Sequence, residues 1–295
     1  MTVLVFSWGY EYIAAKNVLD AIHPITLVFF KYSIAFLIMF AIKVIRTRAD
    51  HARVFPVNKK DLPFYFLCAI FGEILYYVGE YGAIGYLPVS TVTILLSFVP
   101  ILSIIIEWIV YKRRPGAGVI IGVAVCVVGV GFVVGGDIGQ IFGRSGTGYL
   151  LAVMAIVSWN IYNFITAKLA DSYTAYDLTM LQLIASAIVS MPYAVTHLPD
   201  AAAVDGGFVF SIGYLVVCGS ILGFIIYVNA VGSIGVTPTT LFSNMMPVTS
   251  TFFGWLFLGE LIRPIQIVGG IVVVTAGSVV IWLKGREQDK EAPHV

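Results

Sequence analysis

The sequence Phe71-Gly-Glu-Ile-Leu-Tyr-Tyr-Val-Gly-Glu80 lies within an apolar run that extends from about residue 62 to 84. An apolar run of this length is typical of a helix that crosses a lipid bilayer. It nevertheless contains two carboxylates, Glu73 and Glu80, which are seven residues apart. A charge near the bilayer centre costs from about 3 to more than 10 kcal/mol, so we expect both side chains to face protein or a water-filled cavity.

Helical periodicity places these carboxylates beside aromatic residues. Glu73, Tyr76, Tyr77 and Glu80 stand at i, i+3, i+4 and i+7, so an α-helix would present them on one face. Glu73 falls near the middle of the run, where loss of water disfavours the ionised carboxylate. Glu73 is therefore a candidate for proton binding coupled to solute movement, with a structural, hydrogen-bonded acid as the alternative.

The composition indicates an integral membrane protein. Hydrophobic residues make up 59% of the 295 residues, charged residues make up only 11%, and the mean hydropathy is +0.96. Soluble domains carry about 25% charged residues. No basic tract interleaved with aromatic residues suggests nucleic-acid binding. The three cysteines and four histidines are scattered without metal-ligand spacing, so we expect no disulfide framework, metal or other cofactor.

The chain is expected to be an all-α integral membrane protein with ten transmembrane helices. Connections such as His23-Pro24 and Arg263-Pro264 carry helix start and stop signals. The ten apolar segments run over residues 2–19, 25–45, 62–84, 88–111, 116–134, 147–169, 176–196, 208–232, 236–258 and 264–283.

The distribution of basic residues predicts the orientation of these helices. The links at residues 43–60 and 112–114 and the short tail after residue 283 are basic, and all fall on one side of a ten-helix path. The opposite links offer little beyond Lys16, Arg144 and Arg263. The positive-inside rule then predicts a multi-pass protein of the cytoplasmic (inner) membrane with both termini in the cytoplasm.

The two halves of the sequence resemble each other at an offset of about 150 residues. Ser7-Trp8 recurs as Ser158-Trp159, and Pro100 followed by Trp108 recurs as Pro247 followed by Trp255. We therefore expect a five-helix repeat over residues 1–135 and a second over residues 136–295, which also holds the tail. Five is odd, so the second repeat would be inverted relative to the first. This arrangement is typical of secondary transporters.

Several motifs in this order resemble a known family. They are Ser7-Trp8-Gly9 with Lys16, the segment from His23-Pro24 to Lys31, and Trp255-Leu-Phe-Leu-Gly259-Glu260 before Arg263-Pro264. The whole chain is similar in these features to the EamA family of the drug/metabolite transporter (DMT) superfamily. The resemblance implies a carrier of small metabolites, compatible with a monomer. It also implies a central cavity lined mainly by helices 1, 3, 4, 6, 8 and 9, with helices 5 and 10 at the periphery.

The sequence departs from this family at the end of the fourth helix. Lys112-Arg113 replaces the Gly-Glu that usually stands there, whereas the second copy keeps Gly259-Glu260. The two carboxylates are also one-sided, because Phe224 and Val231 occupy the positions that correspond to Glu73 and Glu80. An acid in one repeat only is expected if it binds a proton or one end of an oriented solute.

Polar and aromatic residues near mid-membrane are the candidates for solute binding. Lys31 is expected to pair with Glu80 or Glu11, because buried charges are normally paired. Aromatic faces beside carboxylates favour an amine or ammonium group. The candidate set is Trp8, Glu11, Tyr12, Lys31, Glu73, Tyr76, Tyr77, Glu80, Ser97, Trp159, Tyr162, Asn163, Tyr227 and Asn244.

These features predict a secondary transporter for a small amphipathic metabolite, such as an amino acid or another amine-bearing solute. It would work by alternating access within the lipid bilayer, with proton coupling through Glu73 as a hypothesis. An uncoupled facilitator or exchanger of another small metabolite is the first alternative. An intramembrane enzyme is disfavoured because no zinc motif and no nucleophile with an evident base is present. A channel is disfavoured by the internal repeat.

Overall fold

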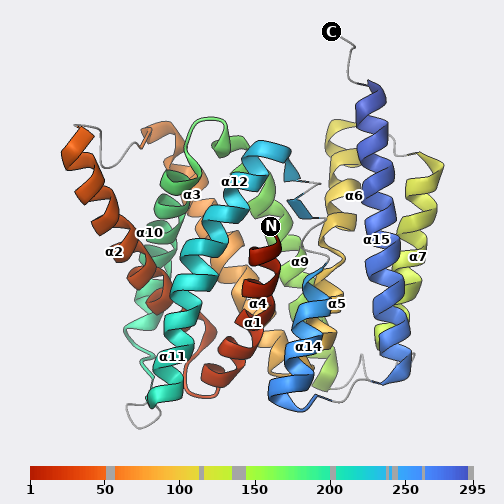
Figure 1. Ribbon diagram of the computed structural model, residues 1–295, viewed down its shortest axis with the longest axis horizontal. Helices are drawn as coiled ribbons and strands as arrows, with labels where there is room; N and C mark the ends of the chain where they lie inside the picture. Colours follow the sequence, from red (N-terminus) through yellow and green to blue (C-terminus); the bar gives the residue numbers. More distant parts are fainter. Residues whose placement is uncertain are drawn as a thin grey trace.

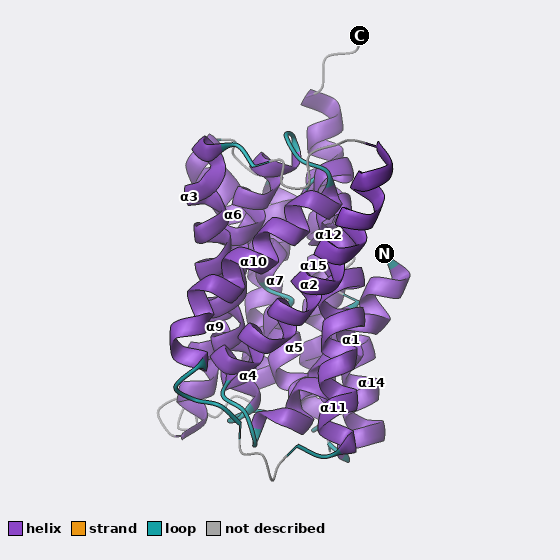
Figure 2. Ribbon diagram, turned by 90° about the vertical axis from the view of Figure 1, so that its left-hand side faces the viewer, coloured by secondary structure: helices purple, strands orange, loops and turns teal. Residues whose placement is uncertain are grey.

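A computed structural model describes residues 1–50, 57–112, 116–134, 144–199, 204–236, 239–240, 245–260 and 263–291. Over these residues the secondary structure is helical and contains no strand, as Figure 2 shows. The all-α fold class is therefore confirmed. Six helical stretches among the described residues are long and apolar enough to cross a membrane, and three shorter apolar helices accompany them.

The first repeat expected from the sequence contains three long helices and several broken ones. The elements are α1 (Thr2–Leu19), α2 (Pro24–Asp50), the 3₁₀ turn η1 (Lys59–Asp61), α3 (Leu62–Cys68), the π-helical η2 (Ala69–Leu75), α4 (Tyr76–Ile84), α5 (Val89–Leu96), α6 (Val99–Tyr111) and α7 (Ala117–Val134). The predicted segment 88–111 is divided into α5 and α6. Pro100 lies at the start of α6 and has no N–H to continue the hydrogen bonds of α5.

The second half shows the same sequence of long and broken helices. Its elements are α9 (Arg144–Ala170), α10 (Ala175–Ala194), α11 (Gly206–Tyr214), the π-helical η4 (Leu215–Gly223), α12 (Phe224–Ile234), α14 (Met246–Leu258) and α15 (Pro264–Glu291). The last helix extends beyond the predicted end at residue 283, and therefore includes most of the charged tail.

The helices form one bundle with two distinct ends (Figure 1). We call the end where α2, α12 and α15 finish the tail end. The end where α1 passes into α2 through residues 20–23 is called the hairpin end. Helices α7 and α15 pack against each other at one side of the bundle. The main core lies between α1, α2, α4, α9, α10 and α12.

Corresponding positions in the two halves share unusual backbone features. The π-helical segments η2 and η4 both interrupt long apolar helices, and their residues match at the sequence offset of about 150. Helices α6 and α14 each contain 13 residues and begin with a proline at the second position. Each ends at a residue in the left-handed region, Lys112 at φ 56° and Gly259 at φ 62°. These features support an internal duplication.

The π-helical segment η2 contains the first of the two carboxylates of this apolar run. A π-helical turn has about one more residue than an α-helical turn, so side chains before and after it no longer keep the α-helical phase. Glu73 lies within η2, whereas Glu80 lies in α4. The two carboxylates accept hydrogen bonds from different tyrosines, Glu73 from Tyr32 and Glu80 from Tyr12 and Tyr76, and that they share one helical face stays a prediction.

Candidate functional site

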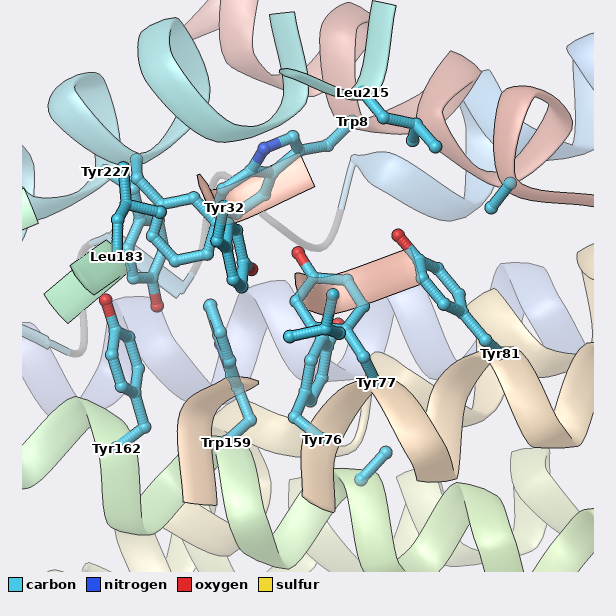
Figure 3. Close-up of a cluster of buried hydrophobic side chains, with 14 of the residues drawn as sticks. Trp8, Tyr32, Tyr76, Tyr77, Tyr81, Trp159, Tyr162, Leu183, Leu215 and Tyr227 are labelled. Carbon is cyan, nitrogen blue, oxygen red and sulfur yellow. The ribbon is translucent and has the colours of Figure 1, made fainter. Parts of the chain in front are cut away.

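Aromatic side chains from four helices meet at the centre of the bundle (Figure 3). Trp8 of α1 lies against Trp159 of α9, with ring centroids 6.0 Å apart. The Trp159 ring is 4.5 Å from that of Tyr76 and 5.3 Å from that of Tyr227. The indole N–H of Trp8 donates to the Gly219 carbonyl at 3.1 Å, which fixes α1 against η4. Most of the predicted aromatic residues therefore gather in one cluster.

Glu80 is the carboxylate on the edge of this cluster. Its side chain is buried, and its Oε1 accepts hydrogen bonds from the hydroxyls of Tyr12, at 2.9 Å, and Tyr76. Among the residues that the structure describes, no lysine, arginine or histidine makes a salt bridge with Glu80. Glu80 is thus an acidic group without a salt-bridge partner in the described structure, held by tyrosine hydroxyls beside aromatic rings.

Glu11 and Lys31 form a separate buried ion pair. The Lys31 Nζ lies 3.1 Å from Glu11 Oε1, and neither residue is more than 5% exposed. The ammonium also lies 3.5 Å from the centroid of the Tyr77 ring and donates to the Tyr81 hydroxyl at 3.1 Å. Of the two partners expected for Lys31, the structure therefore pairs it with Glu11. Cation–π attraction to Tyr77 adds to this pairing.

Glu73 has a different environment from both of these carboxylates. It is fully buried, and its Oε2 accepts a hydrogen bond from the hydroxyl of Tyr32. Its second oxygen, Oε1, has no hydrogen-bond partner within the described part of the chain. Buried polar atoms normally have a partner, so an unpartnered carboxyl oxygen calls for a proton, a water molecule or another ligand.

Two small cavities lie among the central aromatic side chains; Glu80 borders one of them, and Glu73 borders neither. The first, of about 40 Å³, is bordered by Trp8, Tyr12, Tyr76, Thr93, Leu96, Ser97, Val99, Pro100, Trp159, Thr240 and Met246. The second, of about 20 Å³, lies between Trp8, Glu11, Tyr12, Tyr76, Tyr77, Glu80, Trp159 and Met246. These volumes hold about one to a few water molecules, whereas ligand pockets span roughly 300–1,000 Å³. A metabolite would bind here only after the aromatic rings move apart.

The geometry can be compared with known proteins. The sequence profile described as the EamA-like transporter family matches residues 1–135 and 146–283. The chain belongs to the EamA-like transporter family. As an EamA protein it is a multi-pass membrane protein of a transporter family, which confirms the family resemblance seen in its motifs.

Individual relatives of this EamA protein are distant. A probable terminal-alkyne amino-acid exporter of Streptantibioticus cattleyicolor is 25% identical over 238 residues, covering 79% of this chain and 78% of the relative. An uncharacterized transporter of Archaeoglobus fulgidus is 23% identical over 287 residues, covering 96% of this chain and 98% of the relative. A protein of known crystal structure is 16% identical in sequence and superposes with a TM-score of 0.69. The match covers 97% of this chain and 96% of the other chain, and it shows similarity of fold alone.

The remaining predicted residues of the EamA protein lie at different distances from the cavities. Ser97 borders the larger cavity and donates to the Thr93 carbonyl at 3.3 Å. Tyr227 donates to Asn163 Oδ1 at 2.8 Å, and Tyr162 donates to Gln182 Oε1 at 3.1 Å. Tyr162, Asn163 and Tyr227 border neither of the two central cavities. Asn244 lies outside the described residues.

Two hydroxyl donors to the buried carboxylates escaped the sequence prediction. Tyr32 donates to Glu73, and Tyr81 donates to Glu11 at 3.0 Å. A signal existed for each, because Tyr32 directly follows Lys31, and Tyr81 follows Glu80 one helical turn after Tyr77. Tyrosines next to a buried charge in a membrane helix are therefore useful candidates for its partners.

At the hairpin end of this EamA protein, Glu260 joins three helices. Its Oε1 accepts from the Val89 N–H at 2.9 Å and lies 3.3 Å from the Lys16 ammonium. Its Oε2 accepts from the Ser90 N–H at 3.2 Å and the Ser90 hydroxyl at 3.1 Å. The carboxylate thus caps the N-terminus of α5, where negative charge is favoured, and holds it to α1.

A larger recess of about 560 Å³ opens beside this contact. It is bordered by residues of α1, α4 and the following loop, including Lys16, Asp20, Tyr81 and Glu260. Tyr81 also donates to Glu11, so one residue separates this recess from the buried ion pair. The recess is large enough for a small metabolite, whereas the two central cavities are not.

Proposed function

We propose that this EamA protein is a secondary transporter of small amine-bearing solutes, and that an amino acid is the representative substrate. The observation that carries the proposal is Glu80, a buried carboxylate with no cationic partner in the described structure. It borders the same small cavity as Trp8, Tyr76 and Trp159. A carboxylate with aromatic faces is a favourable site for an ammonium group. The amino-acid exporter among the relatives supports the same class.

Charge balance supports a coupling to protons. Around the central aromatic cluster, three buried carboxylates, Glu11, Glu73 and Glu80, accompany one buried ammonium, Lys31. Full ionisation would leave a net charge of −2, and each uncompensated buried charge costs several kcal/mol. We infer that a solute cation at Glu80 and a proton at Glu73 supply the missing positive charge. Movement of the two together would couple solute transport to a proton gradient.

The proposed mechanism is alternating access between two inverted repeats, residues 1–135 and 136–295. The shared π-helical segments and the matching ends of α6 and α14 support this division. The basic links and tail favour a cytoplasmic tail end and both termini on that side of the inner membrane. The hairpin end would then face away from the cytoplasm.

Counterflow into liposomes of the purified protein tests the proposal. The panel contains labelled amino acids, polyamines, quaternary amines and organic anions, each applied to the wild type, Glu80→Gln and Glu73→Gln. We expect an amine-bearing solute to accumulate, Glu80→Gln to weaken its binding, and Glu73→Gln to remove the pH dependence of transport. Glutamine keeps the size of the side chain and removes only its charge.

Three outcomes would contradict parts of the proposal. Accumulation of an anion in place of an amine would make Lys31 the substrate contact and overturn the assignment of Glu80. Unchanged pH dependence in Glu73→Gln would overturn proton coupling and favour an uncoupled facilitator or exchanger. Single-channel currents in a planar bilayer would favour a channel over a carrier.

A further inference from the structure

Glu73 is separated from the cavities at which a solute would bind. Neither central cavity is bordered by Glu73, although both are bordered by Tyr76 of the next helical turn. Glu73 is also completely buried. A proton that came through the solute cavities would have to pass the packed aromatic rings. A proton that binds at the unpartnered Oε1 of Glu73 therefore needs another path from solvent.

Polar side chains of three neighbouring helices continue from Glu73 toward the tail end. Tyr162 of α9 donates to Gln182 of α10 at 3.1 Å, and the Gln182 amide donates to Thr166 Oγ1 at 3.0 Å. The Sγ of Cys68 in α3 lies 3.9 Å from the same hydroxyl. Helices α3, α9 and α10 contact one another, and α9 and α10 also contact η2, which carries Glu73.

Two buried hydroxyls beside this network have no hydrogen-bond partner among the described residues. They are Tyr65 OH, one turn before Cys68 on α3, and Thr179 Oγ1, one turn before Gln182 on α10. Helix α3 lies toward the tail end (Figure 1) and leads directly into η2, which carries Glu73. Together with Glu73 Oε1, these account for three of the four buried unpartnered side-chain atoms in the described structure. Buried groups of this kind commonly bind internal water.

The network reaches water at the tail end. The Tyr173 hydroxyl donates to Asp61 Oδ2 at 2.6 Å and accepts from the Asn58 N–H at 3.1 Å. The rings of Tyr65 and Tyr173 lie 5.7 Å apart. Asp61 and Tyr173 are both partly exposed. Groups that can exchange protons with solvent thus stand directly beside the first unpartnered hydroxyl.

We propose that α3, α9 and α10 enclose a water-bearing proton route from Asp61 at the tail end to Glu73, separate from the solute cavity. This inference rests on the proposed coupling at Glu73. A proton taken from solvent passes along water and the hydroxyls of Tyr65, Thr179 and Thr166, each of which accepts one proton and releases one. It ends on the Glu73 carboxylate and returns to solvent when Glu73 ionises. Gln182 is a positioning residue, because its amide holds the hydroxyls of Tyr162 and Thr166.

Other titratable groups near Glu73 also influence its charge, and two of them, Cys68 and Tyr162, belong to the network itself. The network residue on α10 is Gln182, which carries no charge. The hydroxyl of Tyr32 donates to Glu73 Oε2. The titratable groups around Glu73 are Tyr32 and Lys31 of α2, Glu11 of α1, Cys68 of α3, Tyr77 of α4 and Tyr162 of α9. A test must therefore slow the arrival of the proton without changing these neighbours.

Tyr65→Phe and Thr179→Val meet this requirement, because each removes a hydroxyl that bonds to no described protein atom. Time-resolved infrared spectroscopy after a pH jump would follow the protonated carboxyl band that disappears in Glu73→Gln, with the proton as the only probe. We expect each variant to slow the appearance of this band about fivefold or more, the loss expected for one hydrogen-bonding site of the path, with the final amplitude unchanged.

Matched controls remove hydroxyls away from the route. Tyr214→Phe and Thr249→Val delete hydroxyls that donate to the carbonyls of Ser7 and Val5, and should leave the rate unchanged. Solute counterflow at equal pH on both sides should also be unchanged in the two route variants. Wild-type rates in Tyr65→Phe and Thr179→Val would overturn the route. A wild type without any Glu73-dependent band would instead overturn proton binding at Glu73, and the proposed coupling with it.

Discussion

Glu80 and Glu73 belong to one continuous apolar helical run, but their hydrogen-bond partners and their positions relative to the central cavities differ. Glu80 accepts from two tyrosines and borders a cavity between indole rings. Glu73 accepts from one tyrosine, borders neither central cavity and has an oxygen with no described partner. The comparison teaches that distance along a membrane helix does not assign a role to a carboxylate. Its partners on other helices do.

Removing Lys31 is expected to have the largest effect, because it takes away the cation that both regions share. Lys31→Met would leave Glu11 as a buried charge without its partner, at a cost of about 3–5 kcal/mol in the free energy of unfolding. Thermal unfolding in detergent would measure the loss.

The double variant Lys31→Met with Glu11→Gln distinguishes the partners of Lys31. It should recover most of the lost stability, since no unpaired charge is left at Glu11. Recovery with Glu80→Gln or Glu73→Gln in place of Glu11→Gln would show that the cation serves one of those carboxylates. That result would contradict the assignment of Glu11 as the partner of Lys31, with Glu73 and Glu80 unpaired.

A methyl group at Gly72 should disturb the Glu73 region without touching Glu80. An added Cβ would lie 2.1 Å from Cδ2 of the Tyr162 ring, so the ring or the helix must shift. We expect Gly72→Ala to lower the free energy of unfolding by about 1–3 kcal/mol, the usual range for overpacking. Gly82→Ala is the matched control on the same run, because its Cβ would meet only the end of Leu151 at 3.1 Å. Equal losses in denaturation experiments would contradict the tight packing at Gly72.

Two tyrosine substitutions of the same chemistry should separate the two carboxylates. Tyr76→Phe removes a donor from Glu80, and Tyr32→Phe removes the donor from Glu73. Each loss is expected to cost about 1 kcal/mol, or about fivefold in the affected constant. Tyr76→Phe should change the KM for the amine, whereas Tyr32→Phe should shift the pH profile of transport. The reverse pattern would exchange the roles assigned to the two carboxylates.

The smallest effect is expected at His23, far from both carboxylates. Burial and the nearby His197 lower the pKa of His23 from its ordinary value of 6.5. The folded protein therefore binds fewer protons there than the unfolded chain, so stability falls as the pH drops below about 6.5. We expect His23→Gln to remove a shift in unfolding temperature of under about 2 °C between pH 7 and 5. A larger residual shift in this variant would identify the contribution of other groups to the pH dependence.

Much of the fold could be predicted from local sequence. The first helix, predicted at 2–19, is Thr2–Leu19, and the apolar run 62–84 forms continuous helical structure over Leu62–Ile84. Such agreement is expected, because an apolar run of bilayer length and a proline or glycine at its end are local signals. The family motifs were also sufficient to indicate the EamA-like transporter family.

The interactions within the site could be predicted only in part. The sequence identified Glu11 and Glu80 as possible partners of Lys31, but the choice depends on how three helices pack. The π-helical turn at Ala69–Leu75 has no evident local signal, and it separates Glu73 from Glu80. The hydroxyl of Tyr32, 41 positions before Glu73, illustrates the general difficulty that partners distant in sequence leave no periodic pattern. The orientation in the membrane stays a prediction.

The contact at Glu260 has a consequence for the timing of movement at the hairpin end. One carboxylate receives the N–H groups of Val89 and Ser90, the Ser90 hydroxyl and the Lys16 ammonium, and both oxygens turn about a single bond. These contacts are therefore expected to break together, so α1, α5 and the end of α14 would separate in one abrupt event and not by gradual widening. The corresponding position in the first half is Arg113, whose positive charge cannot serve a helix N-terminus in this way. We therefore expect the position of Arg113 to offer no counterpart to the carboxylate contact at Glu260.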